Sequence, residues 1–209
     1  MKYNFIAIEG NIGSGKTTLA TSIASDFGAR LLLEQFANNP FLPKFYKSPE
    51  ENAFALELFF MAERYQQLKE HKEQDLFSPI TVSDYFFIKS KLFATNNLRE
   101  DEQKLFNRLF DIMVSFLPFP DIIIYLYADI PRLQENIKKR ARSFEQNMSD
   151  EYLNDIQNIY LDYLTKQNKI PVLILDITKV DFTDNKEIYK EIKGLLDFQY
   201  DIGIHRFVL

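Results

Sequence analysis

The sequence predicts an α/β fold, a doubly wound parallel five-stranded sheet with helices flanking both faces, within one domain spanning residues 1–209. Three observations lead to this prediction. Short, almost continuous apolar runs alternate with longer segments of helical periodicity, which is typical of parallel sheets with right-handed crossovers. A glycine-rich loop follows the first apolar run, and a length of 209 residues suits one domain.

The strands are expected where apolar residues run almost without interruption. Strands of a parallel sheet are covered on both faces, so their side chains need not alternate between apolar and polar. Five runs meet this description, at residues 3–8, 30–33, 79–82, 121–127 and 171–175.

The helices are expected between these runs, where apolar residues recur every three or four positions, as on one buried helix face. Asp184 and Glu187 also have the spacing of a capping box, which predicts the start of the last helix. The expected helices span residues 16–27, 50–73, 85–95, 99–117, 130–141, 149–167 and 184–197.

Composition argues against several classes of function. The 30 acidic and 25 basic residues give a net charge of −5, which is unlike a general nucleic-acid binder. The chain has no cysteine and only two histidines, so thiol chemistry and a histidine-rich metal centre are not expected. No apolar run approaches the roughly 20 residues of a membrane span. No signal peptide is recognisable either, so a cytoplasmic protein is expected.

The glycine-rich loop matches the phosphate-binding pattern G-x-x-x-x-G-K-[ST] and lies between a strand and a helix, as that motif requires. Glycines allow backbone N–H groups to point into the turn, where the helix N-terminus adds positive potential. Lys16 is expected to reach the β- and γ-phosphates of ATP, and the Thr17 hydroxyl to bind Mg²⁺. The predicted ATP-binding residues here are Gly10, Asn11, Ile12, Gly13, Ser14, Gly15, Lys16, Thr17 and Thr18.

Further segments extend this motif along nearly the whole chain. They are 8–18 (IEGNIGSGKTT), Glu34 followed by 39–41 (NPF), Tyr46 within FYKSPEENAFALE, 140–146 (RARSFEQ) and 180–182 (VDF). In their order and spacing these segments resemble the deoxyribonucleoside kinases. The resemblance implies ATP as phosphoryl donor, Mg²⁺ as its companion ion, and an arginine-rich lid at about residues 140–148.

The resemblance also implies roles for individual residues. Glu34 stands at the position of the carboxylate that faces the 5′-hydroxyl group of the nucleoside. Tyr46 and Glu145 correspond to the two residues that contact the 3′-hydroxyl group. The loop that holds the adenine of ATP corresponds to Val180, Asp181 and Phe182.

One departure from the family pattern concerns the third strand. An acidic residue, an arginine and a serine usually follow it, whereas this chain has Ser83, Asp84 and Tyr85, so the arginine is missing. Asp84 is the candidate ligand of Mg²⁺ together with Thr17. It also rivals Glu34 as general base, because both carboxylates end strands at the sheet edge where such folds bind ligands. The sequence leaves this choice open.

The second departure is Glu57, which replaces the glutamine that commonly contacts the base. A carboxylate only accepts hydrogen bonds, which favours a base with an amino group, such as adenine or cytosine, over thymine. The alternative is a structural ion pair with Arg64 or Lys89. Arg64, Lys89 and Phe93 are the other residues expected around the base.

Positive charge is concentrated just before and within the expected lid. Arg140 and Arg142 are assigned to catalysis, because planar guanidinium groups match phosphate oxygens. Lys138 and Lys139 are explained by the preference for cations at the C-terminal end of a helix.

These residues predict ATP-dependent 5′-phosphorylation of a deoxyribonucleoside in nucleotide salvage, with purines favoured and deoxyadenosine first. A thymidylate-type nucleoside monophosphate kinase is one alternative, but only Lys44 and Lys47 lie between Glu34 and Glu57 to bind the phosphate of its acceptor. A non-catalytic ATP-binding subunit is the other, supported by the missing arginine. No nucleic-acid or membrane partner is expected. We expect a homodimer that forms through the apolar helices 50–73 and 99–117.

Overall fold

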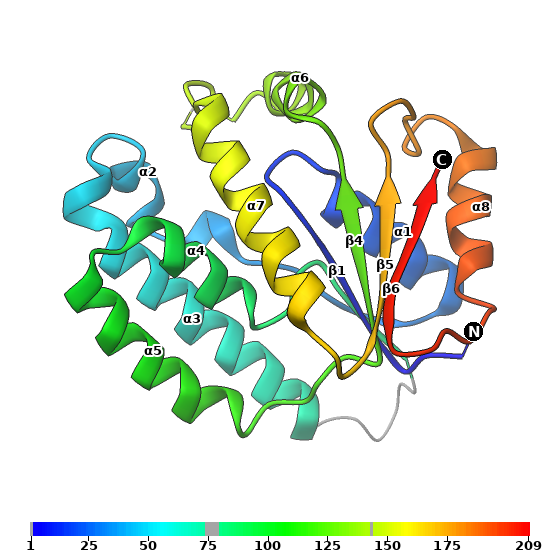
Figure 1. Cartoon of the computed structure of the whole chain (residues 1–209), viewed down its shortest axis with the longest axis horizontal. Helices are drawn as coiled ribbons and strands as arrows, with labels where there is room; N and C mark the ends of the chain where they lie inside the picture. Colours follow the sequence, from blue (N-terminus) through cyan, green and yellow to red (C-terminus); the bar gives the residue numbers. More distant parts are fainter. Residues whose placement is uncertain (1, 74–79, 143) are drawn as a thin grey trace.

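The computed structural model describes residues 2–73, 80–142 and 144–209, and its centre is one parallel sheet in the order β2-β3-β1-β4-β5-β6 (Figure 1). The doubly wound α/β prediction is confirmed, but the sheet has six strands instead of five. The strands are β1 (Phe5–Gly10), β2 (Arg30–Leu32), β3 (Thr81–Ser83), β4 (Ile122–Tyr127), β5 (Pro171–Asp176) and β6 (Gly203–Val208).

The helices fall between the strands, largely as predicted. They are α1 (Lys16–Phe27), α2 (Leu42–Phe45), α3 (Pro49–Glu73), α4 (Lys89–Asn97), α5 (Glu100–Val114), α6 (Ile130–Arg140), α7 (Asp150–Lys166) and α8 (Lys186–Leu195). A short 3₁₀ turn, Phe36–Asn38, and α2 were not predicted. The predicted residues Pro79 and Ser143 lie outside the described part of the chain.

Helices cover both faces of the sheet. Figure 1 shows α1 and α8 on one side and α3, α4, α5 and α7 on the other. Alternate residues of β1 serve these two layers: Phe5 and Ala7 belong to the apolar cluster with α3, α4, α5 and α7, whereas Ile6 and Ile8 belong to the cluster with α1 and α8. Burial on both sides explains the continuous apolar runs. No helix in the described residues is both long and apolar enough to cross a membrane.

One strand is missing from the prediction, and two predicted helix starts are wrong. The sixth strand is not among the five predicted; it pairs in parallel with β5 at the sheet edge and is mostly half-buried. The predicted helix 85–95 begins only at Lys89, because the Tyr85 N–H donates to the Ser83 hydroxyl and the Phe86 N–H to the Glu9 carboxylate. The last helix is capped by Asn185 and not by the predicted Asp184.

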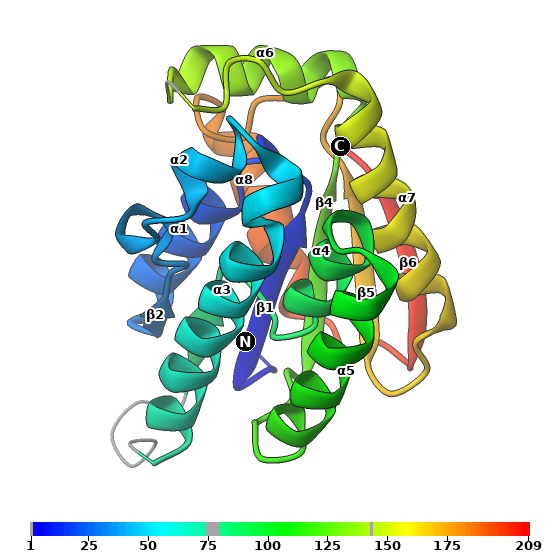
Figure 2. The same cartoon turned by 90° about the vertical axis from the view of Figure 1, so that its left-hand side faces the viewer.

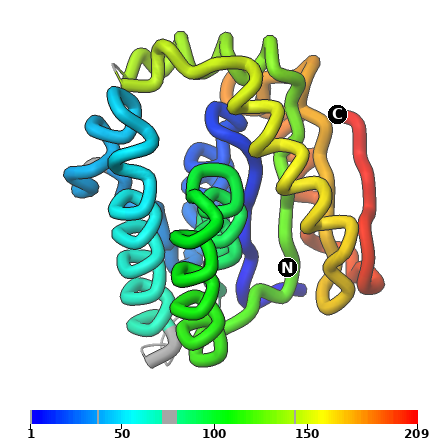
Figure 3. The backbone as a smooth tube through the Cα atoms, turned by 60° about the vertical axis from the view of Figure 1, so that its left-hand side comes forward, coloured from blue at the N-terminus to red at the C-terminus, as the bar shows by residue number. Residues whose placement is uncertain are grey.

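The topology brings several loops to one edge of the sheet. The chain passes from β3 to β4 across β1, so the C-terminal end of β1 lies at the switch point where such sheets bind ligands. Helix α6 crosses above this edge (Figure 2), and α3 and α5 run side by side on one flank (Figure 3). The loops after β1, β2 and β3 therefore meet beneath α6.

Candidate functional site

The phosphate-binding loop joins β1 to α1. Gly15, with φ of 86°, precedes the first residue of α1, and this left-handed conformation suits glycine. The Lys16 Nζ atom donates to the Asn11 carbonyl oxygen at 2.7 Å, so the side chain lies back over the loop. The buried Asn11 amide donates to the Leu153 carbonyl oxygen at 2.8 Å, which anchors the loop to α7.

Two cavities adjoin each other at Lys16 and Thr17. The loop cleft, with an empty volume of about 1130 Å³, lies between the phosphate loop, α6 and the segment after β5. The inner pocket, with about 760 Å³, lies between α3, α4, α7 and the loops after β2 and β3. Arg140 and Arg142 line both cavities.

The predicted residues divide between these cavities. Those of the loop cleft are Gly13, Ser14, Gly15, Lys16, Thr17, Thr18, Val180, Asp181 and Phe182. Those of the inner pocket are Ile12, Lys16, Thr17, Glu34, Tyr46, Glu57, Arg64, Asp84, Lys89, Phe93 and Glu145. Gly10 and Asn11 line neither cavity, because both are buried.

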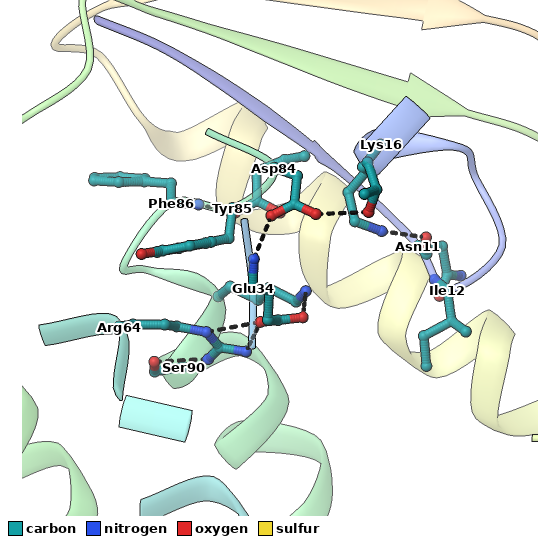
Figure 4. A network of polar contacts seen from close by, with 12 residues as sticks. Asn11, Ile12, Lys16, Glu34, Arg64, Asp84, Tyr85, Phe86 and Ser90 are labelled. Carbon is teal, nitrogen blue, oxygen red and sulfur yellow. Dashed lines mark hydrogen bonds and ion pairs between the residues drawn. The ribbon is translucent and has the colours of Figure 1, made fainter. Parts of the chain in front are cut away.

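Glu34 lies at the centre of a buried ionic network (Figure 4). Arg64 donates from Nε to Glu34 Oε1 at 2.9 Å, and the Lys89 Nζ atom donates to Oε2 at 2.7 Å. Burial alone would raise the pKa of Glu34, but Lys89 and Arg64 outweigh it and hold that pKa well below its usual range. Glu34 therefore remains an ionised acceptor at any physiological pH.

Asp84 lies between Glu34 and the phosphate loop (Figure 4). Its Oδ2 atom accepts a hydrogen bond from the Thr17 hydroxyl at 2.6 Å, and its Oδ1 atom accepts one from the Glu34 backbone N–H at 2.8 Å. The two predicted Mg²⁺ ligands are thus adjacent. Their hydroxyl and carboxylate oxygens, together with phosphate oxygens of a bound nucleotide, are the kind of set that Mg²⁺ prefers.

The missing arginine after β3 has no substitute at the same position. Tyr85 is completely buried, and its hydroxyl group donates to Gln67 at 2.8 Å, away from Glu34. Positive charge reaches Glu34 instead from α3 and α4, through Arg64 and Lys89.

Helices α3 and α4 run antiparallel and exchange two polar contacts. Glu57 and Arg64 are seven residues apart on α3, as are Ser90 and Asn97 near the two ends of α4. Arg64 donates to the Ser90 hydroxyl at 2.8 Å, and the Asn97 amide donates to Glu57 Oε1 at 2.7 Å. Ser90 and Asn97 were not predicted, although polar residues seven positions apart beside buried leucine and alanine are a usable signal.

The alternative interpretation of Glu57, a structural ion pair with Arg64 or Lys89, is not found among the described residues. Both cations bond to Glu34, and the direct partner of Glu57 is the neutral amide of Asn97. Burial therefore raises the pKa of Glu57 to about 7, against the lowering effects of Arg64 and of the Asn97 hydrogen bond. Lys16 also departs from its usual state, because burial and the nearby Lys89 lower its pKa to about 7.

The lid residues are held together by ion pairs. Glu145 is nearly buried and pairs with Arg140 and, at 3.3 Å, with Arg142. The ring of Tyr46 stacks on Phe144, with centroids 5.7 Å apart. The predicted contacts of the 3′-hydroxyl group, Tyr46 and Glu145, therefore lie on one wall of the inner pocket.

Several known proteins are similar to this chain in sequence or structure. A family model described as "Deoxynucleoside kinase" matches residues 6–197. The chain is 36% identical to a deoxyguanosine kinase of Bacillus subtilis over 195 residues, covering 90% of this chain and 93% of that protein. It is 29% identical to a deoxyadenosine/deoxycytidine kinase of the same organism, covering 91% and 90%. A structure of deoxyadenosine kinase from M. mycoides with bound dATP superposes with a TM-score of 0.79 at 26% identity, covering 92% of this chain and 98% of that one.

Proposed function

The chain belongs to the deoxynucleoside kinase family, enzymes that phosphorylate deoxyribonucleosides in nucleotide salvage, and on that premise we propose that it transfers the γ-phosphoryl group of ATP to the 5′-hydroxyl group of a purine deoxyribonucleoside. The observation that carries this assignment is the junction of the two cavities at Lys16 and Thr17, with the ionised Glu34 on the nucleoside side. Nucleoside in the inner pocket and ATP in the loop cleft would meet there.

Glu34 is the proposed acceptor of the 5′-hydroxyl proton. The 5′ oxygen forms a bond to the γ-phosphorus, the bond from that phosphorus to the bridging oxygen breaks, and ADP leaves with the bonding electrons. A carboxylate with a low pKa is a weak base. It suits a loose transition state, in which the proton is transferred late and positioning contributes most of the rate. This orientation role is supported by the two cations that fix both carboxylate oxygens.

Lys16, Arg140 and Arg142 are proposed to stabilise the negative charge on the migrating phosphoryl group. All three line both cavities. Guanidinium groups match phosphate oxygens, and fixed positive charge in a partly dry site stabilises a developing anion. Thr17 and Asp84 would hold Mg²⁺, which neutralises phosphate charge when bound.

The nucleoside is proposed to be held at two ends. Tyr46 and Glu145 would hydrogen-bond the 3′-hydroxyl group, while Glu57 and Arg64 would face the base, with Phe93 as an apolar contact. Relatives named deoxyguanosine kinase and deoxyadenosine kinase support a purine substrate. Deoxyadenosine as the best substrate stays a prediction from the carboxylate at Glu57.

A homodimer remains a proposal, and α5 is the face that supports it. Leu105, Ile112 and Phe116 are 50%, 62% and 60% exposed, and their spacing places them on one side of α5 and its following turn. A second copy of the chain is the proposed cover. By contrast, Met61 and Leu68 of α3 are fully buried within this chain, so α3 contributes less than predicted. Ile112→Glu should dissociate the dimer, as measured by analytical ultracentrifugation; a wild-type monomer would contradict the proposal.

The test of the function is one panel of assays. ADP formation from ATP is measured with each of the four deoxynucleosides and with thymidylate, and the nucleotide products are identified by mass. We expect purine deoxynucleosides to give 5′-monophosphates, and Lys16→Ala to reduce the rate by about 10³-fold. Turnover of thymidylate alone would establish the monophosphate-kinase alternative, and no turnover with any acceptor would refute the proposed reaction.

A further inference from the structure

Glu57 is a buried carboxyl group on the wall of the inner pocket. Glu57 is 2% exposed, and its side chain lines the same cavity as Tyr46 and Phe93. Asn97 donates to its Oε1 atom at 2.7 Å and so fixes the plane of the group. A base bound in this pocket meets an oriented carboxyl group.

The charges around Glu57 come from every element packed against it. Arg64 on α3 and Lys89 on α4 favour the ionised form, but both are bonded to Glu34. Glu34 itself, after β2, opposes ionisation. Two phenol groups also face it, Tyr152 from α7 and Tyr46 at the end of α2. Neither proton state of Glu57 is therefore locked by a direct ion pair within the described residues.

Guanine and adenine differ in the pattern of hydrogen-bond donors and acceptors that they present to the carboxyl group of Glu57. Guanine offers two neighbouring donors, N1–H and the 2-amino group, whereas adenine offers the 6-amino donor beside the N1 acceptor. An ionised carboxylate only accepts, and a protonated carboxyl group accepts at one oxygen and donates from the other. The ionised form therefore complements guanine, and the protonated form complements adenine. The wrong pairing leaves buried polar groups unsatisfied, which is strongly disfavoured.

We propose that Glu57 selects between purine deoxynucleosides through its own proton, favouring deoxyguanosine when ionised and deoxyadenosine when protonated. This inference rests on the proposed function and adds the identity of the purine to it. Because burial raises the pKa of Glu57 to about 7, both forms are present near neutral pH. The prediction of deoxyadenosine as best substrate then applies on the acidic side of neutrality.

The test is a competition between the two purines. Equal concentrations of deoxyadenosine and deoxyguanosine are phosphorylated in one vessel at several pH values between about 6 and 8, and the ratio of the two monophosphate products is measured. That ratio equals the ratio of kcat/KM values, so ionisations of Lys16 or Glu34, which act on both substrates alike, cancel. We expect the deoxyguanosine product to gain by about tenfold per pH unit relative to the deoxyadenosine product.

Variants separate Glu57 from other causes. Glu57→Gln carries a donor and an acceptor at every pH, so its product ratio should not change with pH. Glu51→Gln, on the exposed face of the same helix, should retain the wild-type slope. Asn97→Leu removes the hydrogen bond that favours the ionised form of Glu57. The product ratio should therefore move about tenfold toward deoxyadenosine at each pH. This variant tests the inference even if Glu57→Gln does not fold.

The outcomes are distinct. If both purines are phosphorylated but the wild-type ratio is flat with pH, or if Glu57→Gln keeps the slope, the inference is overturned and the kinase function stands. If neither purine is phosphorylated at any pH, the proposed function itself fails.

Discussion

Replacing Glu34 by glutamine tests the proposed base and the buried ionic network together. Glutamine keeps the shape of the side chain but cannot take a proton. Loss of a positioned general base lowers kcat by about 10²–10⁴-fold. Nucleoside KM should change much less, because the residues proposed to hold the sugar and base remain.

The same substitution has a consequence for stability that a solvent-exposed base would not have. The side chains of Arg64 and Lys89 are only 4% and 7% exposed, and Glu34 is the anion bonded to both. Removing one partner of a buried ion pair costs about 3–5 kcal/mol. The amide oxygen still accepts one hydrogen bond, so we expect about 3 kcal/mol. For a chain of this length that corresponds to a melting temperature lower by about 6–12 °C.

The assay compares Glu34→Gln with Asp84→Asn, because these two carboxylates were the competing candidates. Steady-state kinetics and calorimetric melting are measured on both variants and the wild type. Asp84→Asn should weaken the binding of Mg²⁺ and ATP, because Asp84 contacts Thr17, the other proposed Mg²⁺ ligand, and the backbone N–H of residue 34. If Glu34→Gln keeps kcat within a few-fold while Asp84→Asn abolishes it, the base is Asp84. An unchanged melting temperature in Glu34→Gln would refute the ionic network.

Three further predictions follow from the site. Lys89→Met should lower kcat by about 10²-fold, because it removes a cation beside Glu34 that stands in for the missing arginine; Lys91→Met, on the exposed side of the same helix, is the control, and equal activity of the two variants would count against this role. A 3′-deoxynucleoside should react with kcat/KM lower by about ten- to a hundredfold, because it cannot form the hydrogen bonds proposed between the 3′-hydroxyl group and Tyr46 and Glu145, worth about 1–3 kcal/mol; similar efficiency with both sugars would contradict the assignment. Folding raises the pKa of Glu57 from 4.5 to about 7. Between these two pH values the native state holds a proton that the unfolded chain has lost, so the free energy of unfolding falls as the pH rises from 4.5 to about 7. Glu57→Gln should therefore gain up to about 3 kcal/mol over wild type in urea unfolding at pH 8 but not at pH 5, and equal differences at both pH values would exclude a raised pKa.

The order of strands and helices was predictable from the sequence, because covered strands and amphipathic helices leave local patterns. The sixth strand was missed because it lies at the sheet edge, where His205 and Arg206 interrupt the apolar run and pairing with β5 decides its conformation. The start of α4 was misplaced for a different reason. Tyr85 and Phe86 resemble a helix start, but Glu9, far away in the chain, captures the Phe86 N–H at 2.6 Å.

The membership of the candidate site was also largely predictable, whereas its pairings were not. The resemblance to the deoxyribonucleoside kinases predicted one site for Glu34, Glu57, Arg64 and Lys89, and all four line one cavity. Which carboxylate binds the cations depends on the distance between α3, α4 and the loop after β2, and no sequence pattern encodes that distance. Because Glu34 binds the cations, the direct hydrogen-bond partner of Glu57 is the neutral amide of Asn97.

The glycines of the phosphate-binding loop have a second effect: because they lack a side chain, later parts of the chain can pack close to the loop. A Cβ atom at Gly10 would lie 2.7 Å from a carbonyl oxygen of β4, one at Gly13 2.8 Å from a carbonyl oxygen of α6, and one at Gly15 2.8 Å from the ring of Phe182. Three later segments of the chain therefore pack directly against the loop in the folded protein, at the positions where the glycines have no side chain. An alanine at any of these positions would disturb this packing with or without a bound nucleotide, so weakened ATP binding in such a variant would not report on phosphate contact alone. Substitution of the Lys16 side chain tests the phosphate contact directly.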